Sequence, residues 1–177
     1  MATHHAVLTV LGADRPGLVD EVSAFALDCG GNLEDSRMVN LRGQFAIMML
    51  VAGSEKVMVR LRDKLGTLRR EGGVHAELTE TDVDQPRTAG TTIPYRLTTT
   101  GMDHPGLMQS IAHLLRAMNV NIESADTTLR CAPVTGTPLF EMEFVLSVST
   151  ETPVAELREA VGRVADELNM DWQLAAL

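Results

Sequence analysis

Two short segments of the sequence carry residue types that can bind a small anion. The first is Asp14-Arg15-Pro16-Gly17-Leu18 and the second is Asp103-His104-Pro105-Gly106-Leu107. Each precedes a stretch with helical spacing, and the free N–H groups at a helix N-terminus attract a carboxylate. A glycine at this point lets a ligand approach the backbone without meeting a Cβ. The same residues are also typical of a plain helix start, and from the residues alone both interpretations stay open.

An asparagine follows each segment at the same distance. Asn32 and Asn121 lie eighteen residues after the aspartate of their segment. The backbone N–H groups of Gly17 and Gly106 suit an anion, and the aspartates and the asparagine side-chain oxygens are hydrogen-bond acceptors.

These segments belong to an internal repeat. Residues 8–36 align without a gap on residues 97–125, at an offset of 89. The identical positions are Leu8/Leu97, Thr9/Thr98, Gly12/Gly101, Asp14/Asp103, Pro16/Pro105, Gly17/Gly106, Leu18/Leu107, Asn32/Asn121 and Glu34/Glu123. Because five of the nine fall within residues 12–18, the match reflects a duplicated module and not shared composition.

The elements that must position the motif have the same order in both copies. Short apolar runs at 6–11 and 95–100 predict strands that end at Gly12 and Gly101. Pro16 and Pro105 are expected in the first helical turn, which Asp14 and Asp103 would cap. Apolar residues at spacings of three and four then predict amphipathic helices, which Gly30-Gly31 and Asn119 end.

The rest of each copy predicts a hairpin, a second helix and a last strand. The hairpins are 33–41 with 44–51, turning at Arg42-Gly43, and 122–130 with 139–149. The second helices carry two apolar stripes: Val57, Leu61, Leu65 and Leu68, then Val154, Leu157, Val161, Val164 and Leu168. The last strands are 74–81 and 171–177.

The expected fold class is α+β: two ferredoxin-like βαββαβ domains, each an antiparallel sheet with helices on one face. Domain 1 is 1–82, a polar linker is 83–92, and domain 2 is 93–177.

The motif resembles that of the ACT domain, the small-molecule regulatory module of amino-acid metabolism. The resemblance covers nearly all of both halves and is strongest over 8–36 and 97–125. A chain of two such domains is similar to the transcriptional repressor type of the glycine cleavage system. It implies sheets joined edge to edge, with a small amino acid of the glycine or serine class bound at an interface between domains. The implied ligand-binding residues are Asp14, Arg15, Pro16, Gly17, Leu18 and Asn32, and Asp103, His104, Pro105, Gly106, Leu107 and Asn121. The copies differ at Arg15 and His104, which implies that the two sites are not equivalent.

Composition argues against several other functions. The formal net charge is -9, the wrong sign for phosphate contacts, and only six residues are Trp, Tyr or Phe. One helix has a basic face of Lys56, Arg60, Arg62, Lys64, Arg69 and Arg70, interpreted as solvated. Direct nucleic-acid binding is therefore not expected.

No run reaches the ~18 apolar residues of a membrane helix, and no signal peptide precedes the first strand, so a cytoplasmic protein is expected. The single cysteines, Cys29 and Cys131, agree with a reducing compartment.

No catalytic or cofactor motif is present. None of the five histidines lies in an HExxH or Cys-His cluster, and no phosphate-binding glycine loop precedes a helix. No enzyme activity, cofactor or metal is therefore expected. The sequence predicts a non-enzymatic, homodimeric regulator that binds a small amino acid and acts through a transcription factor or metabolic enzyme. The alternative is a ligand-free dimerisation or scaffold module that regulates an amino-acid enzyme.

Overall fold

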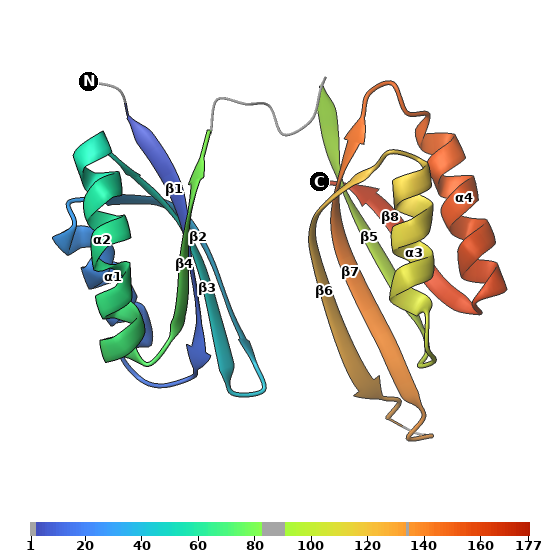
Figure 1. Ribbon diagram of the computed structural model, residues 1–177. Helices are drawn as coiled ribbons and strands as arrows, with labels where there is room; N and C mark the ends of the chain where they lie inside the picture. The colour runs from blue at the N-terminus through green and yellow to red at the C-terminus, as the bar shows by residue number, and fades with distance from the viewer. Residues whose placement is uncertain (1–2, 83–90, 134) are drawn as a thin grey trace. The chain divides into compact units, whose positions relative to one another are not determined.

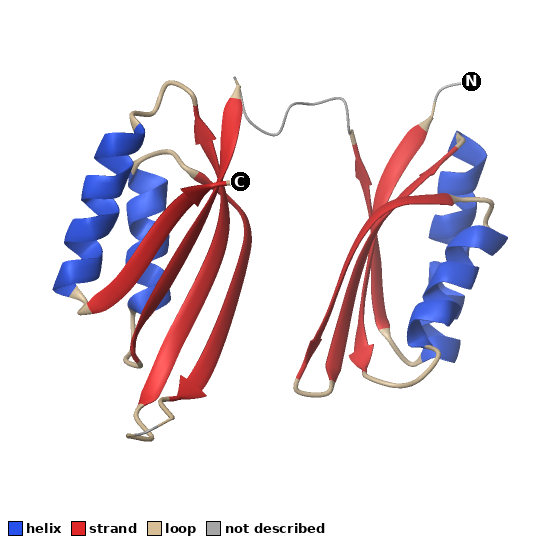
Figure 2. Ribbon diagram, turned by 180° about the vertical axis from the view of Figure 1, so that it is seen from behind, coloured by secondary structure: helices blue, strands red, loops and turns tan. Residues whose placement is uncertain are grey.

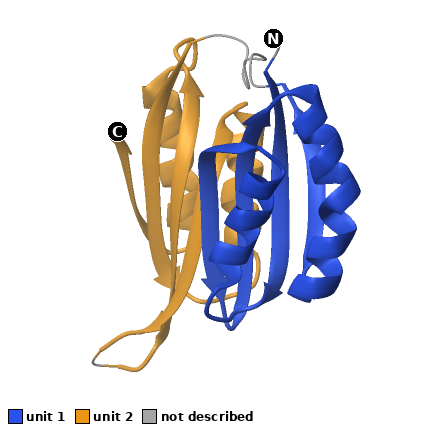
Figure 3. Cartoon of the chain, turned by 90° about the vertical axis from the view of Figure 1, so that its left-hand side faces the viewer, with its two compact units in different colours: residues 1–86 blue, residues 87–177 orange. Residues whose placement is uncertain are grey.

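The computed structural model describes residues 3–82, 91–133 and 135–177 as two compact units, Met1–Pro86 and Arg87–Leu177 (Figure 3). Most of the predicted linker, residues 83–90, lies outside the described residues, and Thr92 begins a strand. Each unit is described by itself. Within each, strands and helices follow the predicted order, as Figure 1 shows.

Unit 1 is a four-stranded antiparallel sheet with two helices. Its elements are β1 (His4–Ala13), α1 (Leu18–Asp28), β2 (Asn32–Leu41), β3 (Gln44–Gly53), α2 (Glu55–Gly72) and β4 (His75–Thr81). The strand order is β2-β3-β1-β4, so β1 is central and β2 is an edge. The two-residue hairpin loop at Arg42 and Gly43 has φ values of 50° and 82°, as expected of a type I′ turn.

Unit 2 repeats this arrangement. Its elements are β5 (Thr92–Met102), α3 (Leu107–Ala117), β6 (Asn121–Cys131), β7 (Pro138–Ser149), α4 (Val154–Glu167) and β8 (Met170–Ala176). The strand order is β6-β7-β5-β8, which again makes the first strand central. The predicted α+β class with two βαββαβ sheets is confirmed.

In both units the helices lie on one face of the sheet, and no helix of the described residues covers the other (Figures 1 and 2). The alternate residues Leu8, Val10 and Ile47 point to the helices of unit 1 and are fully buried. Leu97, Phe144 and Leu146 do the same in unit 2. Burial of a side chain of this size stabilises the fold by about 1.5–3 kcal/mol.

The first helix of each unit begins later than predicted and without an aspartate cap. α1 and α3 start at Leu18 and Leu107, so Pro16 and Pro105 precede the helices. The N-cap residues are Gly17 and Gly106, and neither helix has a side-chain cap hydrogen bond. The prediction that Asp14 and Asp103 cap these helices is therefore wrong, because a left-handed glycine turn separates each aspartate from its helix.

Both helices end as predicted. Gly30, with φ 84°, and Asn119, with φ 54°, are the residues in left-handed conformation. The N–H of Gly31 donates to the Ala26 carbonyl, and the N–H of Val120 donates to the Leu115 carbonyl. This is the Schellman arrangement, which satisfies carbonyls that the helix leaves unpaired.

The two cysteines differ in their environment. Cys29 is fully buried at the end of α1, where burial raises the pKa of its thiol, while Cys131 is exposed. Since the thiolate is the reactive form, a buried thiol with a raised pKa reacts slowly.

We expect a thiol reagent such as Ellman's reagent to titrate one cysteine in the native protein and the second only after unfolding. A Cys131→Ser variant should show almost no native thiol, and rapid reaction of that variant would contradict this placement of Cys29.

Candidate functional site

The glycine turns leave space beside the backbone in both units. Gly17 has φ 90° and Gly106 has φ 100°, and a Cβ built on either would meet no atom within 4 Å. The carbonyls of these glycines accept the first helical bonds, from the N–H groups of Glu21 and Ser110. In unit 1 the N–H of Leu18 donates to the Arg15 carbonyl at 3.3 Å, and the remaining N–H groups of a first helical turn have no partner within the helix. This geometry suits a small anion that approaches the backbone.

In unit 1 this turn is tied to neighbouring elements. The guanidinium of Arg15 donates to both carboxylate oxygens of Glu21, at 2.5 and 2.6 Å, and to the carbonyl of Gly72 at the end of α2. The side-chain amide of Asn40 donates to the Asp14 carboxylate at 2.6 Å. Two predicted ligand-binding side chains, Asp14 and Arg15, therefore already hold protein groups.

The equivalent turn of unit 2 lacks these ties. The positions equivalent to Glu21 and Asn40 are Ser110 and Leu129, which cannot pair in the same way. In the part of the chain that the structure describes, the Asp103 carboxylate has no hydrogen-bond partner, and His104 is exposed with Nδ1 3.2 Å from the Pro105 carbonyl. The difference expected at Arg15 and His104 thus has a structural counterpart. The turn of unit 1 is held by side-chain hydrogen bonds, and we call it the braced turn; the turn of unit 2 lacks them, and we call it the open turn.

The two asparagines lie at the other end of the module. Asn32 pairs with Ala52 near the end of β3, and Asn121 pairs with Ser147 near the end of β7. The turns lie beyond Ala13 and Met102, at the far end of the central strands. One helix of 11 residues separates each turn from its asparagine, roughly 16 Å at the usual rise. The structure therefore does not bring the turn and the asparagine of one module together.

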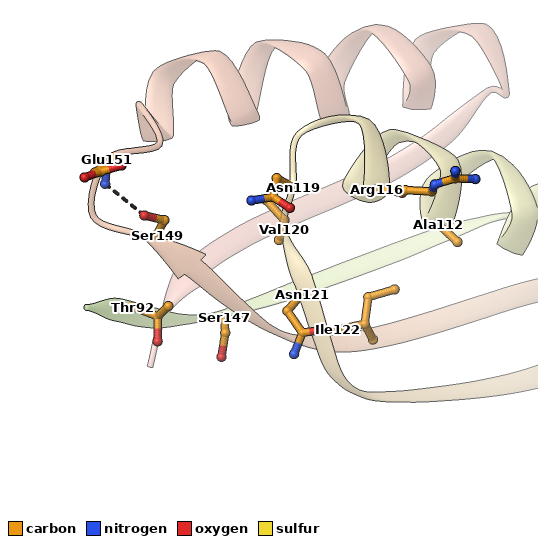
Figure 4. Close-up of a pocket in the computed structure, with 10 residues that line it drawn as sticks. All are labelled: Thr92, Ala112, Arg116, Asn119, Val120, Asn121, Ile122, Ser147, Ser149 and Glu151. Atoms are coloured by element: carbon orange, nitrogen blue, oxygen red, sulfur yellow. Dashed lines mark hydrogen bonds between the residues drawn. The ribbon is translucent and has the colours of Figure 1, made fainter. Parts of the chain in front are cut away.

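A hollow surrounds Asn121 in unit 2 (Figure 4). Its volume is about 620 Å³. Its lining residues come from α3 and the loop after it, from β5, β6 and β7, and from the loop before α4: Thr92, Ala112, Arg116, Asn119, Val120, Asn121, Ile122, Ser147, Ser149 and Glu151. In Figure 4 the side chains of Thr92, Asn121 and Ser147 point the same way. None of the residues of the turn at 103–107 lines it.

Hydrogen bonds hold the asparagine of this hollow in place. The Asn121 amide and the Ser147 hydroxyl both donate to Oε1 of Glu123, at 2.7 and 2.8 Å. Because the amide nitrogen of Asn121 makes this bond, its amide oxygen is the group that can accept from a ligand. Arg116 adds a cation to the lining, and Glu151 adds an anion.

Sequence reasoning did not single out Arg116, Ser147, Ser149 or Glu151. Ser147 lies opposite Asn121 only because of a register shift between Ile122 and Ser124 in the β6–β7 ladder. The sequence pattern placed Arg116 on a helix and Ser147 on a hairpin strand, but it did not reveal the register shift that brings Ser147 opposite Asn121.

Among the described residues, no group of three His, Cys, Asp or Glu side chains could hold a metal ion, and no helix is long and apolar enough to cross a bilayer.

Comparison with known proteins agrees with this fold. The ACT domain model matches residues 4–79. A UPF0237 protein of Methanopyrus kandleri is 42% identical over 80 residues, which are 44% of this chain and 89% of that protein. The chain belongs to the ACT domain family. We call the two βαββαβ units its ACT modules, module 1 and module 2.

Other similarities involve a repressor. The glycine cleavage system transcriptional repressor of Escherichia coli is 40% identical over 62 residues, which are 35% of this chain and 33% of the repressor, so the match spans about a third of that protein. A Galdieria sulphuraria protein of unknown function superposes with a TM-score of 0.81 and 26% identity over 99% of both chains. A candidate glycine cleavage system transcriptional repressor superposes with a TM-score of 0.75 and 20% identity, over all of this chain and 99% of the other.

The braced turn of module 1 makes stability depend on pH. The hydrogen bonds from Arg15 hold the pKa of Glu21 below its ordinary value of 4.5. A carboxyl group with a lowered folded pKa stabilises the fold above its unfolded pKa, and the contribution disappears as pH falls through the folded value. We expect Glu21→Gln to lower the melting temperature of module 1 at pH 7 and to make no difference below the lowered pKa. A double-mutant cycle with Arg15→Ala measures the coupling, and a coupling that persists unchanged at pH 2 would refute this account.

The glycine turns should be sensitive to any side chain, although they are open. At φ 90–100° an L-residue is strained by about 1–2 kcal/mol even without a clash. We expect Gly17→Ala and Gly106→Ala each to lower the free energy of unfolding by about this amount, measured by urea denaturation. Gly66→Ala, inside α2, is the matched control, and it should be neutral or stabilising because alanine favours a helix. Equal effects at all three positions would argue against strain at the turns.

Proposed function

We propose that the chain is a cytoplasmic, non-enzymatic regulator that binds a small amino acid of the glycine or serine class and modulates transcription or amino-acid metabolism through a protein partner. The observation that carries the proposal is the open glycine at a helix N-terminus, which occurs in both ACT modules. The similarity to a transcriptional repressor of the glycine cleavage system supports the same class of function.

The proposed ligand chemistry divides between two ends of a module. Backbone N–H groups beside Gly106 bind the carboxylate, and the Asp103 carboxylate accepts from the ammonium group. The Asn121 oxygen offers a second acceptor, at the far end of α3. A ligand that contacts both ends therefore lies at an interface between ACT modules, which a homodimer provides by joining modules of two chains.

Module 2 is the better candidate for the binding turn. Its Asp103 carboxylate is available, whereas Asp14 is held by Asn40 and Arg15 by Glu21. A ligand at the turn of module 1 would have to break these bonds. The two modules then have different roles: the turn of module 2 binds, and that of module 1 braces α1 against α2.

Direct contact with nucleic acid is not part of this proposal. Three of the six basic side chains of α2 already have protein partners. Arg60 donates to the Cys29 carbonyl, Arg69 donates to the Ala76 carbonyl, and Arg62 pairs with Glu80. A chain of net charge -9 with its basic helix partly neutralised acts on transcription through a protein partner.

Calorimetric titration with glycine and L-serine tests the proposal. We expect saturable binding that Asp103→Asn weakens at least tenfold, because the ammonium group loses a charged acceptor. Asn121→Ala should weaken it too, by removal of the second acceptor. N,N,N-trimethylglycine, which keeps the carboxylate but has no N–H donor, should bind poorly.

The matched control is Asp14→Asn in module 1. It should lower the melting temperature, since it perturbs the bond from Asn40, but leave ligand affinity unchanged. An equal loss of affinity in Asp14→Asn and Asp103→Asn would contradict the assignment to module 2. Absence of heat and of any thermal shift with either amino acid at millimolar concentration would favour the ligand-free scaffold.

A further inference from the structure

The sheet faces that carry no helix have opposite character in the two modules, although the folds are the same. In module 1 the side chains that point away from the helices on the central strands are Val7, Thr9 and Leu11 of β1 and Ala46, Met48 and Leu50 of β3. Five of these six are apolar, and Leu11 and Met48 are 45% and 50% exposed. Val39 and Leu41 on β2 extend the surface, at 55% and 72% exposed. We call these eight residues the apolar face.

Charged and hydroxyl side chains take seven of the eight equivalent places in module 2, and the eighth, equivalent to Leu50, is Val145. By strand register, Met48 corresponds to Glu143, and Ala46 to Glu141. The repeat aligns Val7 with Arg96, and Leu41 with Arg130. Two ion pairs result, Arg96–Glu143 at 3.2 Å and Arg130–Glu141 at 3.1 Å. The fold therefore does not require an apolar surface here, and its presence in module 1 points to a partner.

The row of residues across the middle of this sheet indicates which partner. Ladder pairing places Arg37, Met48, Thr9 and Glu77 side by side, from the β2 edge to the β4 edge. The row is basic at one edge, acidic at the other and uncharged between them. A two-fold axis parallel to the strands, between two stacked copies, sets each Arg37 opposite a Glu77 and each apolar centre on the other.

The corresponding row of module 2 has no such complementarity with a second copy of itself. It reads Asp126, Glu143, Thr98 and Gln173, with two acids and no base. In an acidic chain, two copies approach most readily through a surface that offers a base to an acid of its partner. Arg37 already pairs with Asp35 at 2.7 Å on the same edge, which leaves the apolar centre free of unpaired charge. An apolar centre with a polar rim is the usual composition of a protein interface.

We propose that two chains associate through the apolar face of module 1, sheet against sheet, with Arg37 of each copy facing Glu77 of the other. Sheets packed in this way lie about 10 Å apart with nearly aligned strands. The interface is isologous, so it closes as a pair and does not propagate. It needs neither an amino-acid ligand nor the glycine turns, so the association is tested without ligand, and the proposed ligand site is tested separately by calorimetry.

Light scattering coupled to size-exclusion chromatography tests this association, without amino acid and at tens of micromolar chain. We expect Met48→Glu to halve the mass of the particle and to weaken association at least a hundredfold. The substitution installs the residue that module 2 holds at the same place, so the fold tolerates it. Glu143→Gln on module 2 is the control and should leave the mass unchanged.

Charge reversal tests the pairing itself. Arg37→Glu should weaken association at least tenfold, and the Arg37→Glu/Glu77→Arg double variant should restore it. If Met48→Glu does not fold, as judged by circular dichroism, Leu41→Arg with Val39→Thr installs the other module 2 residues at the equivalent places. A wild-type chain that is monomeric at 100 micromolar, or a folded Met48→Glu or Leu41→Arg/Val39→Thr variant that keeps the wild-type mass, would overturn the proposal.

Discussion

The central place of the first strand in each sheet determines where the glycine turn and the asparagine of a module lie. β1 and β5 each pair with two neighbours along most of their length, so each runs from one end of its module to the other. The glycine turn must follow at the far end, and the helix then carries the chain back to the asparagine. Because the antiparallel ladder keeps these points apart, one module offers a ligand either the turn or the asparagine. A ligand that contacts both, as we propose, needs a second module.

Duplication has given this chain two turns that differ in what they can do. The backbone conformation is the same in both, with Gly17 and Gly106 at φ 90° and 100°. The side chains around them differ, since Arg15 clamps α1 to the end of α2 and His104 clamps nothing equivalent. The hydrogen bonds of the module 1 turn hold α1 to the end of α2, while the turn of module 2 is the one that we propose for the ligand. The same backbone geometry with different side chains thus gives two turns with different contacts.

The two sheet faces show the same division. Ion pairs on module 2 keep its face solvated, whereas module 1 leaves Met48 and Leu11 exposed at the middle of a sheet. Exposure of this kind lowers the solubility of an isolated monomer, so a partner that covers it stabilises the assembly. The proposed amino-acid site at the turns and the proposed association through the sheet use different surfaces, and a shift in one can bias the other only through the packing within a module.

The sequence by itself determined the repeat, the element order and the position of both glycine turns. Gly17 and Gly106, the Schellman ends at Gly30 and Asn119, and the two-residue turn at Arg42-Gly43 all depend on neighbours in the chain, which is why local pattern predicted them. The capping role of Asp14 and Asp103 was wrong for a local reason, a left-handed residue between cap and helix that the pattern does not display. Only the tertiary structure decided what the charged groups contact: Asn40 meets Asp14 from 26 residues away, and Gly72 meets Arg15 from 57. Such contacts, and the balance of charge across the sheet of module 1, depend on which strands lie side by side and in which register, and a single residue of shift changes every pair.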